Sequence, residues 1–315
     1  MVSRDVPATG DAPRAPADPR AAVQRVVESV SQTWHRQPPA IAGRIDVPLS
    51  VVAALALLAP AAADSSTLLA AYLDRVPAPV VGGLLRDLWA VYVNLRPDLV
   101  ARAYPLFSWL FDPDVSDELI GAARTTAAAA VRAGQVEITG TGARHEVDLL
   151  GVLLTELRSD AARKGHGQVY TPADLAQITA ELLGVGQTAE GATIHEPAAG
   201  TGGMLRAAAQ AIRAAGRDPA AMRWVAVDID ELAIACLAVN THLWGLGLNV
   251  LLGVGNALTD QWCERAEGER AECIELARTV RRDRLALRLL TTLSALVDEV
   301  ADERQPSDHP SAPQP

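Results

Sequence analysis

The sequence predicts an α/β protein in which a helical amino-terminal region precedes a partial, doubly wound parallel sheet. Three observations support this fold class. The chain reads as successive helices between prolines up to about residue 163, short apolar runs alternate with helices from about residue 165, and no strand pattern follows residue 254. Strands that alternate with helices are typical of parallel sheets.

The composition is that of a folded protein with disordered ends. Hydrophobic residues make up 49% of the chain and charged residues 21%. Residues 1–20 and 302–315 lack apolar periodicity, so we expect both to be disordered. Between them we expect a helical domain over 21–163, an α/β domain over 164–262 and a carboxyl-terminal helix over 263–301.

Charge, cysteines and hydropathy exclude several classes of protein. The net charge of −10 gives no overall attraction to phosphate, so any contact with nucleic acid would be local. Cys236, Cys263 and Cys273 form no close-spaced pair, which disfavours a disulfide framework or a metal site. The most apolar stretch, 47–63, is interrupted by two prolines and is too short to span a membrane. With no signal-peptide pattern, we expect a cytoplasmic protein.

Prolines predict where the helices of the amino-terminal region end. Proline lacks a backbone donor and disfavours a helical conformation in the preceding residue. We expect helix breaks at Pro38-Pro39, Pro60, Pro77, Pro97, Pro105 and Pro113.

Seven elements are expected from Pro172 onward. Their order is a helix from Pro172, a strand ending at His195, a helix over 205–215, a strand over 223–227, a helix over 231–244, a strand over 249–254 and a helix from about 264 to 300.

A glycine-rich loop, Glu196-Pro-Ala-Ala-Gly-Thr-Gly-Gly203, follows the first predicted strand. Glycines there let the backbone approach a ligand at the carboxyl edge of the sheet. The dinucleotide fingerprint needs a third glycine at position 205, where this chain has leucine, so a nicotinamide cofactor is disfavoured. The simpler interpretation is an ordinary turn between strand and helix.

Two further segments point to the same sheet edge. Thr171 and Pro172 are placed to open a helix near it, although they are also compatible with a plain helix start. Asp228 follows the second strand and could accept hydrogen bonds from both hydroxyls of a ribose. Alternatively it is a helix cap or a solvated acid, but Asp230 is the better cap for a helix that begins at Glu231.

In this order, GQVYTP (167–172), EPAAGTGGM (196–204), VAVDIDELAIACLAVNTHLWGLG (225–247) and GNALTD (255–260) resemble the N-6 adenine DNA methylase family. The resemblance is strongest to modification subunits of type I restriction-modification systems. Asp148-Leu-Leu-Gly151 with Glu156 resembles the helix that precedes these motifs. The resemblance covers about 146–260 and implies a partial Rossmann-like, S-adenosylmethionine-dependent methyltransferase domain that methylates adenine N6 in DNA.

The resemblance implies S-adenosyl-L-methionine as the cofactor and assigns residues to its methionine end. Thr171 and Pro172 would lie near the methionine carboxylate, and Glu196 would lie near the amino group. Ala198 belongs to the same cofactor-binding set.

The adenosine end is assigned in the same way. Gly200 and Gly202 would pass beneath the cofactor, Asp228 would hold the ribose and Ile229 would lie against the adenine ring. Asn256 stands where the family usually has an acid that bonds the adenine amino group, and its carbonyl can still accept that bond.

The family's catalytic loop is not found in this sequence. That loop, Asn-Pro-Pro-Phe or Asp-Pro-Pro-Tyr, grips an adenine flipped out of the duplex. The only Pro-Pro pair, Pro38-Pro39, follows Gln37. No residue is therefore assigned a catalytic role, and the resemblance implies contact with DNA through a complex whose partner supplies this loop or target specificity.

Two interpretations remain open. The chain is a component of a DNA adenine methyltransferase, or it is an inactive, cofactor-binding regulatory or assembly subunit. Methylation of a small molecule or protein is disfavoured because the Gln-x-Tyr-Thr-Pro segment is characteristic of the DNA-adenine family.

The predicted sheet is incomplete on the side where the family's fourth strand would pair with the first. We expect the helix from about Cys273 to Val300, or a partner chain, to cover that edge. Arg281, Arg284 and Arg288 share a face of this helix and could bind phosphates, but a solvated face interleaved with acids is the simpler interpretation. His195 has no companion ligand, so we expect a structural role for it.

Overall fold

The computed structural model describes residues 14–58, 65–158, 171–259 and 261–303, and for 294–303 the backbone alone. The ends predicted to be disordered fall largely outside these ranges, although residues 19–20 belong to the first helix and 302–303 to the last. Gly167–Tyr170 of the first motif also lies outside the described residues.

The amino-terminal region is helical. Its α-helices are α1 Pro19–His35, α2 Pro39–Ala42, α3 Asp46–Leu55, α4 Ser65–Arg75, α5 Ala78–Leu95, α6 Val100–Phe107, α7 Asp117–Arg132, α8 Gln135–Thr139 and α9 Leu149–Leu157. Three 3-10 helices accompany them: η1 Pro97–Leu99, η2 Ser108–Phe111 and η3 Gly142–His145.

Most of the predicted helix breaks are confirmed. Pro38 and Pro77 precede α2 and α5 as N-caps, and Pro97 opens η1. The break at Pro105 is wrong, because this proline lies inside α6. It removes one backbone donor only two residues before α6 ends at Phe107, where the chain tightens into η2, so little helix depends on it. Pro60 lies outside the described residues.

The apolar stretch beginning near residue 47 forms the buried helix α3. Every residue from Val47 to Leu55 is buried, and Ser50 within it accepts a hydrogen bond from Trp89 Nε1 at 3.1 Å. Within the part of the chain that the structure describes, no helix is both long and apolar enough to cross a bilayer.

A small parallel sheet follows. Its strands are β1 Thr193–Glu196, β2 Arg223–Asp228 and β3 Val250–Val254, in the spatial order β1-β2-β3. Helix α11 Ala173–Leu182 precedes the sheet, α12 Gly203–Ala214 connects β1 to β2, and α13 Glu231–Leu243 connects β2 to β3; the 3-10 helices η4 Val185–Gln187 and η5 Pro219–Ala221 lie between them. Each of these strands and α-helices agrees with its predicted position to within about two residues.

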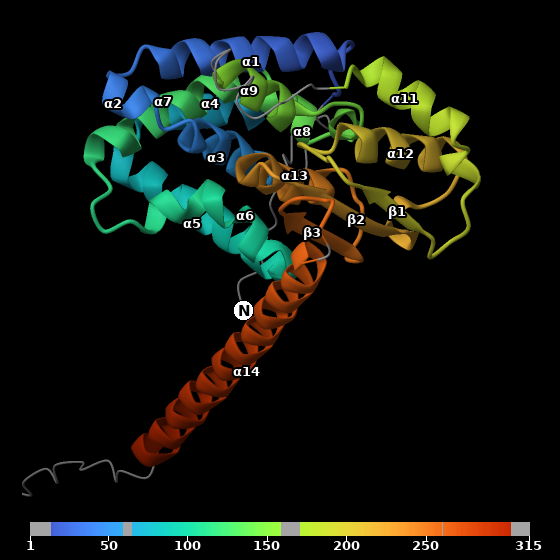
Figure 1. Cartoon of the computed structure of the whole chain (residues 1–315). Coiled ribbons are helices and arrows are strands. Elements are labelled where there is room, and N and C mark those ends of the chain that lie inside the picture. The colour runs from blue at the N-terminus through green and yellow to red at the C-terminus, as the bar shows by residue number, and fades with distance from the viewer. Residues whose placement is uncertain (1–13, 59–64, 159–170, 260, 304–315) are drawn as a thin grey trace, which may run out of the picture.

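The two faces of the sheet pack differently. Trp224 and Ala226 of β2 belong to the main core, which also includes α13 and the amino-terminal helices. Val225 and Val227 point to the opposite face, where Trp262 and Ala266 cover them. In Figure 1, α13 lies between the sheet and the amino-terminal helices, so one continuous core joins both regions.

The last helix, α14 Gln261–Glu303, is a single element of 43 residues. Its first half packs against β3, η1 and α6, with Trp262 close to Gly253 and Arg281 donating to the Asn94 carbonyl, and the rest runs away from the body of the protein (Figure 1). The expectation that this helix covers the edge of the first strand is wrong, because the start of α14 lies against β3 and, through Trp262, against the face of β1 at His195, and the helix then leads away from the sheet. Among the described residues β1 pairs with β2 on one side and has no strand partner on the other.

Candidate functional site

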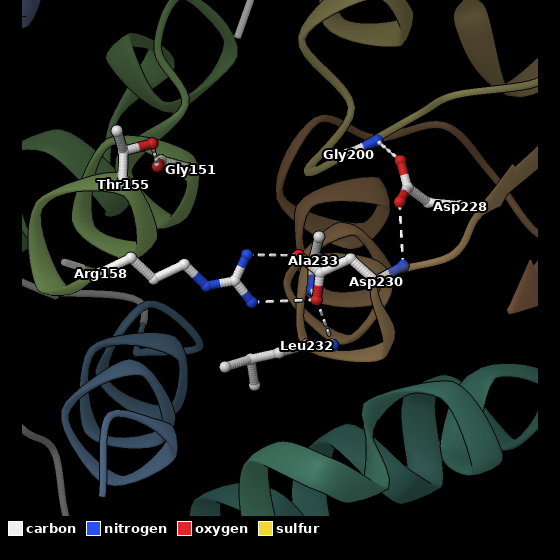
Figure 2. Close-up of polar contacts among 8 residues, drawn as sticks. All are labelled: Gly151, Thr155, Arg158, Gly200, Asp228, Asp230, Leu232 and Ala233. Atoms are coloured by element: carbon white, nitrogen blue, oxygen red, sulfur yellow. Dashed lines mark hydrogen bonds and ion pairs between the residues drawn. The ribbon is translucent and has the colours of Figure 1, made fainter. Parts of the chain in front are cut away.

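The glycine loop after β1 lies against the carboxyl end of β2. Gly200 and Gly202 have φ angles of 51° and 98°, in the left-handed region that favours glycine. The Gly200 amide donates to Asp228 Oδ2 at 2.7 Å (Figure 2), and the Ala199 amide donates to the Val227 carbonyl at 3.0 Å. These bonds fix the loop at the sheet edge where the sequence predicts a ligand.

Asp228 orders two backbone segments at once. Besides the bond from Gly200, its Oδ1 accepts from the Asp230 amide at 2.9 Å. Asp230, and not Asp228, caps α13, because its Oδ1 accepts from the amides of Leu232 and Ala233 at 3.1 and 3.2 Å. The prediction that Asp230 is the cap is confirmed. A carboxylate offers about four acceptor positions, so Asp228 can still bind ligand hydroxyls.

A cavity of about 670 Å³ opens beside Asp228. This volume is within the range of about 300–1,000 Å³ that small-molecule sites occupy. Elements far apart in the sequence line it: Arg20, Val23, Gln24, Glu146, Val147, Asp148, Gly151, Val152, Thr155, Glu156, Thr171, Ala173, Ala198, Ala199, Gly200, Thr201, Gly203, Met204, Arg206, Asp228 and Ile229.

Five of the nine residues predicted to bind the cofactor line this cavity: Thr171, Ala198, Gly200, Asp228 and Ile229. Ile229 is 64% exposed, so an apolar surface is available beside the ribose-binding candidate. Sequence reasoning missed the lining residues from α1 and named Asp148 and Gly151 only as part of a preceding helix.

The other four predicted residues do not line the cavity. Pro172 is the N-cap of α11, and Asn256 uses its side-chain carbonyl to accept from the Leu258 amide at 2.9 Å. Glu196 is half-buried; its Oε1 accepts from the Ala198 amide at 3.3 Å, and burial raises its pKa.

Gly202 approaches the core and not the cavity. A Cβ atom at this position would lie 2.4 Å from Leu237 Cδ1 and 2.9 Å from Trp244. This glycine therefore lets α12 start close to α13.

A half-buried carboxylate, Asp148, ties three elements together at the cavity wall. It accepts from the Gly151 amide at 2.8 Å, from Thr201 Oγ1 at 2.6 Å and from Asn240 Nδ2 at 2.8 Å. Asn240 Nδ2 also donates to the Thr201 carbonyl at 2.9 Å. Burial raises the pKa of Asp148, and these hydrogen bonds oppose that shift. The network joins α9 and α13 to the glycine loop.

Replacing Gly151 with alanine should break this network. The added Cβ would lie 2.2 Å from Asp148 Oδ2 and 2.3 Å from Thr201 Oγ1, so their hydrogen bond cannot keep its geometry. We expect the free energy of unfolding, measured by urea denaturation, to fall by about 1–3 kcal/mol, the cost of unsatisfied buried polar groups.

Gly83→Ala is the matched control, because Gly83 also lies inside a helix but a Cβ added there would have no atom within 4 Å. That substitution should stabilise the protein by roughly 0.5–1 kcal/mol. Equal effects of the two substitutions would contradict a structural role for the Asp148 network.

A buried ion pair fixes the end of α9 to the start of α13. Arg158 and Asp230 have side chains that are 6% and 4% exposed, and Arg158 Nη2 donates to Asp230 Oδ1 at 2.9 Å while Nη1 contacts Oδ2 (Figure 2). Because Asp230 also bonds Asp228 through its backbone amide, this pair supports the residue that faces the cavity.

His195 and the arginines of α14, which the sequence analysis also considered, contact other parts of the protein. The His195 ring stacks on Trp262 with centroids 6.1 Å apart. Of the α14 arginines considered for phosphate binding, Arg281 donates to the Asn94 carbonyl, and exposed ion pairs join the neighbouring Arg278 to Glu275 and Arg282 to Asp283. No cluster of three histidine, cysteine or acidic side chains that could hold a metal ion occurs among the described residues.

Comparison with known proteins agrees with the motifs. Residues 148–274, less than half of the chain, match the family described as N-6 DNA Methylase, which confirms the family resemblance for that segment. No curated protein matches the chain. Among solved structures, the methyltransferase subunit of the type I restriction-modification system from Streptococcus thermophilus is similar, with 17% identity and a TM-score of 0.41. The match covers 78% of this chain and only 60% of that subunit, so this chain corresponds to part of its length.

Proposed function

We propose that this chain is the S-adenosyl-L-methionine-binding component of an adenine-N6 DNA methyltransferase of the restriction-modification type. The charge of the cavity carries this proposal. Four acids, Glu146, Asp148, Glu156 and Asp228, line it together with two arginines. S-adenosylmethionine bears a sulfonium and an ammonium against one carboxylate, so an acidic cavity suits it, whereas the pyrophosphate of a dinucleotide would be repelled.

The cavity residues divide between the two ends of this cofactor. Asp228 would accept the ribose hydroxyls, and Ile229 would pack against the adenine ring. The open backbone at Gly200 would let the cofactor approach the loop, since no atom lies within 4 Å of a Cβ built there. Thr171 and Ala198 would contact the methionine portion, with Pro172 positioning Thr171.

The remaining family residues would act from outside the cavity. Glu196 would attract the cofactor's ammonium once ionised, and the side-chain carbonyl of Asn256 would accept a hydrogen bond from the adenine amino group. Gly202 would act indirectly by fixing the start of α12. Bound S-adenosylmethionine supplies an electrophilic methyl group, and this chain's residues hold and orient it.

Transfer to adenine requires groups that this sequence does not contain. The proposal therefore includes a cytoplasmic complex in which a partner carries the adenine-gripping loop or the target specificity, and contact with DNA occurs through that complex. The division into a helical domain (21–163), a cofactor domain (164–262) and a carboxyl-terminal helix (263–301) is part of the same proposal. The absence of an Asn-Pro-Pro-Phe-type sequence favours the alternative, an inactive cofactor-binding regulatory or assembly subunit.

Methyl transfer by the native complex distinguishes these two functions. The tagged chain, purified with its partners from its host, should transfer tritium from labelled S-adenosylmethionine to DNA, and digestion should release N6-methyladenine. The chain purified alone should transfer none. A complex that binds the cofactor but labels no adenine would exclude the methyltransferase function and leave the regulatory alternative.

A further inference from the structure

The outer edge of β1 is an unpaired edge of the sheet. Among the described residues, β1 pairs only with β2, so its outer backbone donors and acceptors have no strand partner. Parallel strands are normally covered on both faces. The side chains of β2 and β3 are mostly buried, whereas Thr193 and His195 of β1 are exposed and Ile194 and Glu196 are half-buried.

Helix α11 presents an exposed apolar face on the same side of the sheet. Its alanines, Ala176 and Ala180, face inward and pack on Ala207 of α12. Its larger apolar residues face outward: Leu175, Ile178, Leu182 and the adjoining Leu183 are 53%, 52%, 83% and 73% exposed. A helix that buries alanine and exposes leucine and isoleucine has its main apolar face unpartnered. In Figure 1, α11 lies beyond α12, toward the β1 side of the sheet.

Both surfaces end at the candidate site. Ala173 at the start of α11 and Ala198 just after β1 line the cavity. A strand added parallel to β1 would pass beside the apolar face of α11. The residues that follow such a strand would emerge at the mouth of the cavity.

The last helix that the structure describes leads away from this edge. Helix α14 starts against β3, on the far side of the sheet, and its 43 residues extend for about 64 Å.

A second copy of the chain is disfavoured by charge. Asp174, Glu181, Glu190 and Glu196 lie on α11 or beside β1. Arg20 pairs with Asp174, and Arg217 lies nearby on the carbonyls of Gly186 and Thr188, so these four acids outnumber these two arginines. Two copies would bring like charges together, whereas a basic partner would be attracted.

We propose that the outer edge of β1 and the apolar face of α11 bind a strand of a second, basic polypeptide, which runs parallel to β1 and places its following loop at the cavity mouth. This inference rests on the proposed function in one respect, since it identifies where the partner enters the site. Backbone pairing would supply affinity, and alternate apolar side chains of the partner strand would pack against α11.

Site-specific photo-crosslinking in the native host tests this proposal. A photoreactive amino acid is placed at Ile178 in one variant and at Thr193 in another, with exposed Leu68 on α4 as the control position. Mass spectrometry should map both products to one segment of one other polypeptide, with alternating apolar residues typical of a strand. Capture of a protein without this common segment would overturn the proposal, as would crosslinking to a second copy or yields no higher than at Leu68.

A charge substitution separates this interface from cofactor binding. In the Thr193 probe variant, Ile178→Glu should lower the crosslinking yield by about tenfold or more, because it places a carboxylate in an apolar contact. Leu68→Glu should not change the yield. The purified Ile178→Glu chain should bind S-adenosylmethionine as the wild type does. If the wild-type chain does not bind S-adenosylmethionine, the proposed function is wrong and this interface is not affected. If Ile178→Glu leaves the crosslinking yield unchanged, this interface is wrong and the proposed function is not affected.

Discussion

Replacing Arg158 with leucine is expected to lower the free energy of unfolding by about 3–5 kcal/mol, because it removes the buried guanidinium that pairs with the buried Asp230 carboxylate. Both side chains are almost fully buried, so water cannot solvate the remaining charge. Asp230 also caps α13, and distortion of this residue would loosen the first turn of that helix. Urea denaturation of the purified variant measures the effect.

An exposed pair of the same chemistry provides the control. Arg44 binds both carboxylate oxygens of Asp46, at 3.0 and 2.8 Å, but these side chains are 44% and 24% exposed. Arg44→Leu should therefore cost less than about 1 kcal/mol. If Arg158→Leu destabilises the protein no more than Arg44→Leu, the buried pair does not hold α9 to α13.

Replacing Asp228 with alanine is expected to weaken binding of S-adenosylmethionine by roughly 100-fold or more. The proposed bonds from the two ribose hydroxyls to a carboxylate contribute about 1.5–3 kcal/mol each. The substitution also removes the acceptor of the Gly200 amide, which helps to order the glycine loop. Equilibrium dialysis with labelled cofactor measures the change in dissociation constant.

Asp218 supplies the matched control for Asp228. It is also an aspartate that accepts from a backbone amide, that of Ala220 at 2.9 Å, but it does not line the cavity. Asp218→Ala should leave cofactor affinity within about twofold of the wild type, since surface substitutions away from a site usually act within ±0.5 kcal/mol. Similar losses in both variants would show that Asp228 acts through general stability and not through the ribose.

Local signals in the sequence were sufficient to predict the positions of the helices and strands around the sheet. Asp230 precedes a helix and caps it, and short apolar runs bounded by glycine or acids form β2 and β3. The glycine loop identified the sheet edge because its backbone conformation restricts the residue type. These features depend on neighbours in sequence, so they can be predicted without the fold.

Contacts between distant segments were not predictable in this way. Asp148 meets Thr201 and Asn240, which are 53 and 92 positions further along the chain, and nothing in the local pattern pairs them. Arg20 of α1 reaches the cavity only because the amino-terminal helices pack on the sheet region. The error at Pro105 has the opposite cause, because a strong local signal was outweighed by the helix ending two residues later.

Calorimetric titration of the purified chain with S-adenosylmethionine tests the central claim most directly, since it requires neither DNA nor a partner. We expect one saturable binding event per chain that is strongly weakened in Asp228→Ala and abolished in Gly200→Asp, which adds a charged side chain where the backbone must approach the cofactor. The absence of heat or saturation with a folded wild-type chain would contradict the claim that this cavity binds S-adenosylmethionine.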